Sequence, residues 1–284
     1  MESSVLISAA ELAEMMEERR CVVFDCRFDL RHPQGGRNSW LASHIPGAVY
    51  AHLDDNLSGR VTAQSGRHPL PLARSFGAFL ARSGWEPGLQ AVAYDAQGGA
   101  LASRLWWLMR YFGLGDARLL DGGISAWRQA GLPLEAGEVT APRKTAAELV
   151  AHPALAIGAH ALARLLENRQ VTLIDARAGS RFRGEVEPID AVAGHIPGAV
   201  NRPYKLNLLS DGRFKQAAAL KNEFTQLIGR AGASEVVHMC GSGVTACHNL
   251  LAMELAGQHG SRLYVGSWSE WIRDPLRPVA VAGG

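Results

Sequence analysis

The chain has 284 residues, a length that suits one large domain or two domains of about 140 residues each. Apolar residues make up 47% of the sequence, and 29 Lys and Arg residues nearly balance 27 Asp and Glu residues, which leaves a net charge of +2. This composition is typical of a soluble globular protein, and the near balance of charge gives no reason to expect a nucleic acid or a membrane surface as a partner.

The N-terminal segment and the cysteines indicate a reducing compartment. The segment MESSVLISAAELAEMMEERR at 1–20 contains acidic residues early and lacks the long apolar core of a secretory signal. No apolar run approaches the roughly 20 residues that span a bilayer. The 4 cysteines contain no Cys-x-x-Cys pair, and a disulfide framework is not expected in a chain of this length without an export signal. We therefore expect a cytoplasmic protein.

Helix and strand signals alternate along the first half of the chain. The apolar spacing from Leu12 to Met16 is that of an amphipathic helix, and the apolar run CVVFDC at 21–26 predicts a buried strand. A second apolar run, AVAYD at 91–95, predicts another strand, and ALASRLWWLMRYFG at 100–113 has a helical pattern. The first half is therefore expected to contain strands that are separated by helices.

The second half repeats this order. An amphipathic helix is predicted from Leu162 to Leu166, and strands are predicted at VTLIDA (171–176) and EVVHMC (235–240). A helical pattern, TACHNLLAMELAG, follows at 245–257. Strands separated by helices imply right-handed crossovers, so each half is predicted to form an α/β domain whose mostly parallel sheet is covered by helices on both faces.

Three matched segments in the same order indicate a tandem duplication. Ile7 pairs with Ile157, 150 positions later, and SHIPGAV at 43–49 recurs as GHIPGAV at 194–200. Further along, DGGISAW in the first half faces GSWSEW in the second half. Ordered matches with nearly constant spacing are not expected by chance. We therefore predict three regions, namely a first domain at 1–136, a linker at 137–154 and a second domain at 155–284.

Cys240 lies at the end of a predicted strand, and six small residues, GSGVTA, follow it as a helical pattern resumes. In parallel sheets, ligands bind beyond the carboxyl ends of the strands. Gly241 and Gly243 give the loop the dihedral freedom to curl so that successive backbone N–H groups point inward. A helix that opens near Thr245 would add about 0.3–1 kcal/mol of preference for an anion. The loop therefore predicts a cradle for a sulfur anion on Cys240.

Several motifs together resemble the tandem-domain rhodanese-type sulfurtransferases. They are the HIPGAV repeats, RLWWLMRYFG, DGGISAW, GSWSEW and the loop CGSGVTA, which is similar to the version found in 3-mercaptopyruvate sulfurtransferases. The resemblance covers almost the whole chain and implies two rhodanese-like domains. It also implies that Cys240 takes sulfur from a small-molecule donor and holds it as a persulfide. The acceptor would be a small thiol, a thioredoxin-like protein or cyanide, and no cofactor or metal would be needed.

The resemblance also implies roles for the other residues of the loop. Ser242 is expected to be catalytic, by hydrogen-bonding the thiolate or relaying a proton, although a loop serine is also a common turn former. Gly241, Gly243, Val244 and Thr245 are expected to bind the substrate. For Thr245 the alternative is that its side chain caps the following helix.

Asp95 stands opposite Cys240 when AVAYDAQGGALASR is aligned with VVHMCGSGVTACHN. A carboxylate is not a sulfur nucleophile in this setting, so the first domain is expected to be catalytically inactive. Its expected role is to wall the active site and to stabilise the second domain. A degenerate first domain is also what the resemblance implies.

Arginine recognises carboxylate and sulfonate groups through paired N–H donors. By resemblance, Arg181 in the segment SRF matches the donor-binding arginine of the family. Arg177 is expected to pair with a structural carboxylate because Arg27 matches it in the first half, and Arg183 is expected to lie on the surface. The mercaptopyruvate enzymes usually carry another arginine near the position of EVEPID, whereas this chain has Pro188, Ile189 and Asp190 there. The thiosulfate-using rhodaneses also lack this arginine.

Two donors and one non-enzymatic role remain open. The thiosulfate-using rhodaneses typically carry basic residues directly after the cysteine, whereas this chain has Gly241 and Ser242. We favour 3-mercaptopyruvate over thiosulfate, because this loop contacts the sulfur directly; pyruvate enolate would be the leaving group. A sulfur carrier or protein-binding module is the non-enzymatic alternative. A cysteine phosphatase is disfavoured, because the loop position that needs arginine is Ala246.

The remaining cysteines and histidines are expected to be structural. Cys21, Cys26 and Cys247 have no glycine loop beside them. His238 and His248 flank the loop of Cys240, but their spacing matches no zinc pattern, so no metal site is expected. Both halves share the histidine of HIPGAV, which favours a structural role in the turn for His44 and His195.

Overall fold

The structure is a computed structural model that describes residues 4–115 and 117–281. These residues form two compact units. The first unit contains the chain up to Gly59 together with Leu70–His152 and Leu209–Phe214, and the second contains Arg60–Pro69, Pro153–Leu208 and the chain from Lys215 onward.

The first unit is built around a sheet in which every neighbouring pair of strands is parallel. In the described residues the strand order is β1-β5-β4-β2-β3. The strands are β1 (Leu6–Ile7), β2 (Cys21–Asp25), β3 (Val49–Tyr50), β4 (Gln90–Tyr94) and β5 (Arg118–Leu120). The helices are α1 (Ala9–Glu17), α2 (Gly35–Ala42), α3 (Ala73–Arg82), α4 (Ala102–Tyr111) and α5 (Gly123–Gln129).

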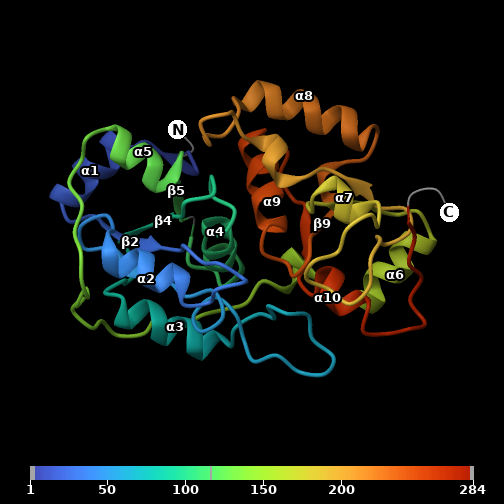
Figure 1. Ribbon diagram of the computed structural model, residues 1–284, viewed down its shortest axis with the longest axis horizontal. Coiled ribbons are helices and arrows are strands. Elements are labelled where there is room, and N and C mark those ends of the chain that lie inside the picture. The colour runs from blue at the N-terminus through green and yellow to red at the C-terminus, as the bar shows by residue number, and fades with distance from the viewer. Residues whose placement is uncertain (1–3, 116, 282–284) are drawn as a thin grey trace. The chain divides into compact units, whose positions relative to one another are not determined.

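Alternation along β2 explains why helices cover both faces of this sheet. Val23 belongs to one core cluster with Leu12 of α1 and Trp127 of α5. The next residue, Phe24, points to the opposite face, where its ring lies 5.7 Å from that of Phe79 in α3. In Figure 1, α1 and α5 accordingly lie together on one side of β2, β4 and β5, and α3 lies on the other.

The second unit repeats this architecture. Its described strands are parallel throughout and follow the order β6-β10-β9-β7-β8. The strands are β6 (Ala156–Ile157), β7 (Thr172–Asp175), β8 (Val200–Asn201), β9 (Val236–Met239) and β10 (Arg262–Tyr264). The α-helices are α6 (Ala159–Glu167), α7 (Gly179–Phe182), α8 (Ala217–Ile228), α9 (Ala246–Leu255) and α10 (Ser267–Trp271), and short 3-10 helices span Pro153–Leu155, Tyr204–Asn207 and Ala233–Glu235.

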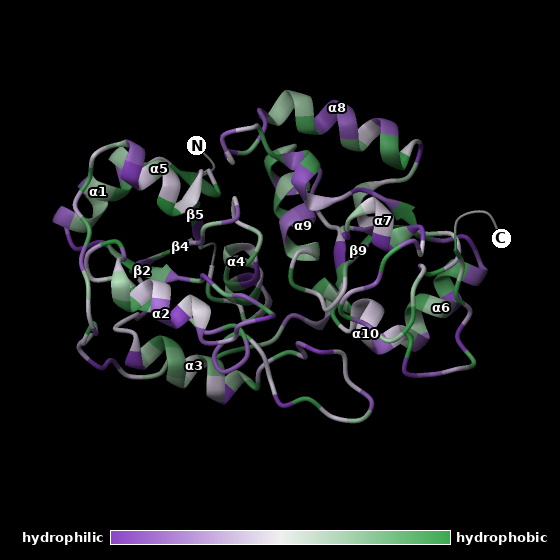
Figure 2. Cartoon of the chain, viewed as in Figure 1, coloured by the Kyte–Doolittle hydropathy of each residue, from purple (hydrophilic) through white to green (hydrophobic). Residues whose placement is uncertain are grey.

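The core of the second unit matches that of the first. Leu162 of α6 and Trp268 of α10 pack in one cluster with Val237 and Met239, which are alternate residues of β9. Helix α9 packs against β9 and against α8. Along α8 the hydropathy alternates between polar and apolar, as Figure 2 shows, because this helix has one buried side. The expectation of two α/β domains with parallel sheets and helices on both faces is confirmed.

Two short segments are exchanged between the units: each belongs to the unit that is formed mainly by the other half of the sequence. Arg60–Pro69 lies in the second unit and Leu209–Phe214 lies in the first. Within the second unit, the backbone N–H of Arg67 donates to Ser269 Oγ at 3.0 Å. A Cβ on Gly66 would lie 2.4 Å from the carbonyl oxygen of Gly266, so only glycine allows this close backbone approach. The predicted domain limits did not include such an exchange.

The residues between the two repeats are tied to the first unit. The N–H of Lys144 donates to the carbonyl of Ala81 at 2.9 Å, and the N–H of His152 donates to that of Tyr111 at 2.8 Å. The side chain of Lys144 also binds Glu86 at 2.8 Å. Across the described ranges, no helix has the length and apolar character needed to cross a membrane.

Candidate active site

Cys240 directly follows β9, the central strand of the second sheet. Its backbone N–H donates to Ser267 Oγ at 3.1 Å, and its carbonyl accepts the N–H of Trp268 at 3.0 Å. Ser267 has a φ of 52°, a left-handed conformation that costs a serine roughly 1–3 kcal/mol. The start of α10 therefore holds the backbone of Cys240 in place at the expense of local strain.

The two glycines of the cysteine loop (residues 240–246) serve different purposes. Gly243 has a φ of +75°, and a Cβ there would lie 2.3 Å from the carbonyl oxygen of Val265. Gly241 does not have a positive φ; a Cβ there would instead lie 3.2 Å from Arg67 Nη2 and 3.6 Å from Arg181 Nη1. Dihedral freedom is thus needed at Gly243 only, and the prediction for Gly241 was wrong in its reason. Gly241 leaves room for two guanidinium groups.

Several backbone amides of the cysteine loop have no acceptor within the described part of the chain. They are those of Gly241, Ser242, Val244 and Thr245. Helix α9 begins one residue later, and Thr245 occupies its N-cap position without a side-chain cap bond. The capping alternative for Thr245 is therefore not supported. Free amides at a helix N-terminus are the groups that stabilise an anion.

The matching loop of the first unit is filled by a carboxylate. Asp95 Oδ1 accepts the N–H groups of Gln97 and Gly99 at 2.7 and 2.9 Å. Its Oδ2 accepts those of Leu101 and Ala102 at 2.7 and 3.0 Å. A loop with the same place in the repeat thus surrounds an anion with backbone amides, at a residue that aligns with Cys240.

Ser242 has a histidine partner that the sequence analysis missed. Its Oγ lies 2.7 Å from His68 Nδ1, and both side chains are buried. His68 belongs to the segment Arg60–Pro69, which the fold places in the second unit. A hydroxyl that is paired with an imidazole can donate or accept a proton while the ring supplies or takes up its replacement.

Arg181 is held beside the cysteine loop by two carboxylates. Its Nη2 donates to Glu187 Oε1 at 2.6 Å and to Asp190 Oδ2 at 3.0 Å, and its Nε also contacts Glu187. Although burial opposes ionisation, the hydrogen bond and charge of Arg181 and the backbone N–H groups of Asp190 and Ile189 keep the pKa of Glu187 below its ordinary value. Arg181 is therefore fixed in one orientation.

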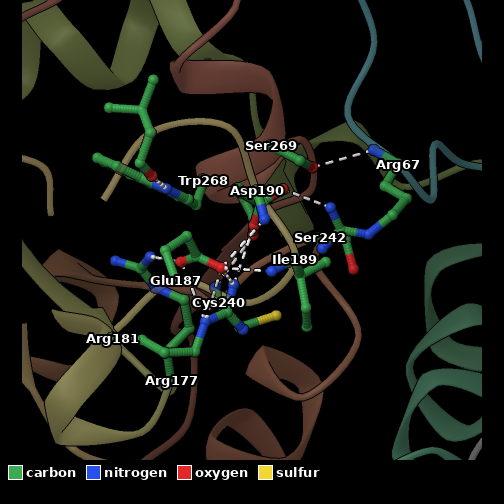
Figure 3. A network of polar contacts seen from close by, with 12 residues as sticks. Arg67, Arg177, Arg181, Glu187, Ile189, Asp190, Cys240, Ser242, Trp268 and Ser269 are labelled. Atoms are coloured by element: carbon green, nitrogen blue, oxygen red, sulfur yellow. Dashed lines mark hydrogen bonds and ion pairs between the residues drawn. The ribbon is translucent and has the colours of Figure 1, made fainter. Parts of the chain in front are cut away.

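Arg67 reaches the same place from the exchanged segment. Its Nη1 binds Asp190 Oδ1, so Asp190 bridges Arg67 and Arg181. In Figure 3, Arg67 lies to the right of Asp190, and Arg181 and Cys240 lie below and to the left of it. The sequence analysis missed Arg67, because the segment around it has no element of its own and lies in the first repeat.

The family model of the rhodanese-like domain matches the chain twice, at residues 8–130 and 158–274. The chain belongs to the rhodanese-like domain family. A protein of Pseudomonas aeruginosa named "Probable 3-mercaptopyruvate sulfurtransferase" is 46% identical over 99% of both chains. A protein of Mycobacterium tuberculosis named "Putative thiosulfate sulfurtransferase SseB" is 42% identical over 97% of this chain and 96% of its own. The solved 3-mercaptopyruvate sulfurtransferase from Leishmania major has a TM-score of 0.83 and 30% identity, and the match covers 98% of this chain and 76% of that one.

Both rhodanese-like units contain the same buried arginine–aspartate pair. Arg177 Nη2 binds Asp175 Oδ2 at 2.7 Å in the second unit, and Arg27 binds Asp25 in the same way in the first. Arg177 Nη2 also donates to the carbonyl of Gly194, directly before HIPGAV. The structural role predicted for Arg177 is confirmed. The predicted surface position of Arg183 is confirmed too, since it is exposed and pairs with Glu185.

The histidines of the two HIPGAV segments bind backbone carbonyls. His44 Nδ1 lies 2.6 Å from the carbonyl of Trp40, and His195 Nδ1 lies 2.7 Å from that of Phe182, which confirms their structural role. Burial lowers the pKa of His238 to about 3. Among the described residues no three His, Cys, Asp or Glu side chains are grouped as metal ligands would be.

Proposed function

We propose that this chain is a sulfurtransferase that moves sulfur from 3-mercaptopyruvate onto Cys240 and then to a thiol or to cyanide. The observation that carries the proposal is the cysteine loop. The N–H groups of Gly241, Ser242, Val244 and Thr245 lack acceptors in the described residues, and the thiol of Cys240 stands where the first repeat has the carboxylate of Asp95. Names that contain "3-mercaptopyruvate sulfurtransferase" among full-length relatives support the same donor.

In the first step, the thiolate of Cys240 attacks the sulfur of the donor. A sulfur–sulfur bond forms, the carbon–sulfur bond breaks, and its electron pair leaves as the enolate of pyruvate, which is then protonated to pyruvate. Ser242 hydrogen-bonds the donor's carbonyl oxygen, where negative charge develops. The imidazole of His68, 2.7 Å from Ser242, supplies the proton that Ser242 passes on.

The persulfide that results carries its negative charge on the outer sulfur. The amides of Gly241, Ser242, Val244 and Thr245 stabilise this charge. Two of them, those of Ser242 and Val244, align with the amides of Gln97 and Gly99, which donate to the carboxylate of Asp95. In the second step, an acceptor thiolate or cyanide attacks the outer sulfur and the Cys240 thiolate leaves. The first domain has no nucleophile at Asp95 and stays inactive.

Donor binding falls to Arg181, with Gly241, Gly243, Val244 and Thr245 around the sulfur. Arg181 presents N–H groups beside Gly241, and its orientation is fixed by Glu187 and Asp190. The acceptor is a small thiol, a thioredoxin-like protein or cyanide, and the protein acts in the cytoplasm. These assignments complete the proposal with no cofactor and no metal.

Thiosulfate is the second candidate donor, because the Mycobacterium tuberculosis relative carries that name at 42% identity. The test is kcat/KM for 3-mercaptopyruvate and thiosulfate, measured side by side with cyanide as the acceptor. A higher value for 3-mercaptopyruvate supports the proposal. A higher value for thiosulfate would mean that thiosulfate is the donor. Loading of Cys240 with one sulfur atom but without repeated turnover would instead identify a sulfur carrier.

A further inference from the structure

Asp190 is shared by two arginines that come from opposite halves of the sequence. Its Oδ1 accepts from Arg67 Nη1, and its Oδ2 accepts from Arg181 Nη2 at 3.0 Å. The Asp190 side chain is only 4% exposed, which leaves its charge to be balanced by these two side chains. Because one carboxylate binds both, the two guanidinium groups are held at a fixed separation beside the cysteine loop.

Each arginine keeps N–H groups that have no acceptor in the described residues. Arg67 Nε is buried and lacks a hydrogen-bond partner, and Arg67 Nη2 donates to no group. Arg181 Nη1 also donates to none, since its bonds to Glu187 and Asp190 use Nε and Nη2. A buried guanidinium N–H without an acceptor costs free energy, which applies here to Arg67 Nε. Arg67 Nη2 and Arg181 Nη1 are accessible donors on charged groups, and together they can bind an anion.

The unused donors converge on Gly241. The Cβ position of Gly241 lies 3.2 Å from Arg67 Nη2 and 3.6 Å from Arg181 Nη1. Gly241 is the residue directly after Cys240, so an anion bound by both arginines would lie next to the residue that reacts.

We propose that Arg67 and Arg181 form a paired-arginine site that binds the carboxylate of the sulfur donor, and that Asp190 holds the two guanidinium groups in position. Arg67 is thus a second substrate-binding residue, supplied by the first half of the sequence. This inference rests on the proposed function, because it takes the donor to react at Cys240.

Charge selects the class of donor at this site. The two arginines are balanced by Glu187 and Asp190, so the four side chains together are neutral. A monocarboxylate brings one negative charge there and a dianion such as thiosulfate brings two, next to a cysteine that must itself become anionic. The planar carboxylate also accepts two parallel N–H bonds in the plane of a guanidinium. The site therefore favours a monocarboxylate donor over the dianion thiosulfate.

The test uses two alkylating reagents that differ in charge, iodoacetate and iodoacetamide, with mass spectrometry of the peptide that contains Cys240. In the unchanged protein, the ratio of the iodoacetate rate to the iodoacetamide rate should be higher for Cys240 than for free cysteine in solution. Pyruvate should protect Cys240 from iodoacetamide. Arg67→Met should lower the iodoacetate-to-iodoacetamide rate ratio and weaken pyruvate protection, each by about tenfold, because one charge-assisted hydrogen bond is lost. Arg183→Met is the matched control, since Arg183 is an exposed arginine of the same segment as Arg181.

A charge exchange keeps the inference testable if Arg67→Met alters the fold. Arg67→Asp should lose the preference for iodoacetate, and the double variant with Asp190→Arg should regain it, because a cation again lies beside Gly241 opposite an aspartate. Equal rate ratios and equal pyruvate protection in Arg67→Met and Arg183→Met would overturn the paired-arginine site while donor turnover still stood. Conversely, an iodoacetate preference that depends on Arg67 in a protein with no donor turnover would leave the anion site intact and refute the proposed function.

Discussion

His68 Nδ1 lies 2.7 Å from Ser242 Oγ, although the two residues are 174 positions apart in the chain. The contact exists because Arg60–Pro69 belongs to the second unit. It turns a loop hydroxyl into a group that can exchange a proton with a buried imidazole.

Removing this pair should slow the chemistry and leave the nucleophile reactive. We expect Ser242→Ala and His68→Ala each to lower kcat with 3-mercaptopyruvate by about 10²–10⁴-fold, because protonation of the leaving enolate is lost. The double variant should lose little more than either single one, since the two residues act as a unit. Alkylation of Cys240 by iodoacetamide should stay within a few-fold of the unchanged rate. A fall in alkylation that parallels the fall in kcat would instead mean that the pair only positions the loop.

Cys240→Ser should abolish sulfur transfer while the protein stays folded, because the substitution is small and the oxygen of serine does not form a persulfide. The measurement combines steady-state turnover with mass spectrometry of donor-treated protein, which should show no added sulfur. Cys21→Ser is the control, since burial raises the pKa of Cys21 to about 11 and that thiol lies in the first unit. More than a few per cent residual activity in folded Cys240→Ser would remove Cys240 as the nucleophile.

The sequence predicts those parts of the site that are local in the chain. Cys240, its loop and the following helix form one continuous stretch, and the long strands β2 and β4 have the apolar runs expected of buried parallel strands. Strands such as β1 (Leu6–Ile7) and β8 (Val200–Asn201) are only two residues long, too short for any periodicity, and they form through their pairing partners.

The exchanged segment could not be predicted in the same way. Arg67 and His68 lie in the segment QSGRHPLP at 64–71, which has no helix or strand pattern, and their partners Asp190 and Ser242 are 123 and 174 positions away. The one available signal was an arginine next to a histidine in a predicted loop, because binding and catalytic residues are common in loops. Likewise, nothing in the sequence distinguished the space-making role of Gly241 from the conformational role of Gly243.

The carboxylate of Asp95 should stabilise the first unit. It accepts four backbone N–H groups, so Asp95→Asn would turn an NH2 group toward two of these donors and leave them unpaired. We expect the free energy of unfolding to fall by about 2–3 kcal/mol. Asp29→Asn is the matched control, because Asp29 is exposed and accepts one backbone N–H group, from Arg31. Urea unfolding of the full chain measures both, and equal stability of the two variants would contradict the anchoring role of Asp95.

Gly243→Ala should damage the cysteine loop more than a left-handed backbone alone explains. The φ of +75° would cost alanine about 1–2 kcal/mol, and its Cβ would also lie 2.3 Å from the carbonyl oxygen of Val265. Gly47→Ala separates the two effects, since Gly47 has a φ of +69° and open space around its Cβ position. Both variants should be destabilised, and only Gly243→Ala should lose sulfur loading of Cys240. Loading at the unchanged rate in Gly243→Ala would show that the loop tolerates displacement.

His238 should make the second unit sensitive to acid. Burial lowers its pKa to about 3, and its Nδ1 has no hydrogen-bond partner among the described residues. The ring is neutral in the folded protein, whereas the unfolded chain takes up a proton near the ordinary pKa of about 6.5.

The stability that His238 contributes is therefore complete above this pH and decreases as the pH falls toward 3. Between pH 6.5 and 5 the loss should be about 2 kcal/mol. His238→Leu should remove this part of the pH dependence in urea unfolding, and the exposed control His160→Leu should retain it; parallel pH profiles for the two variants would exclude His238 as the source.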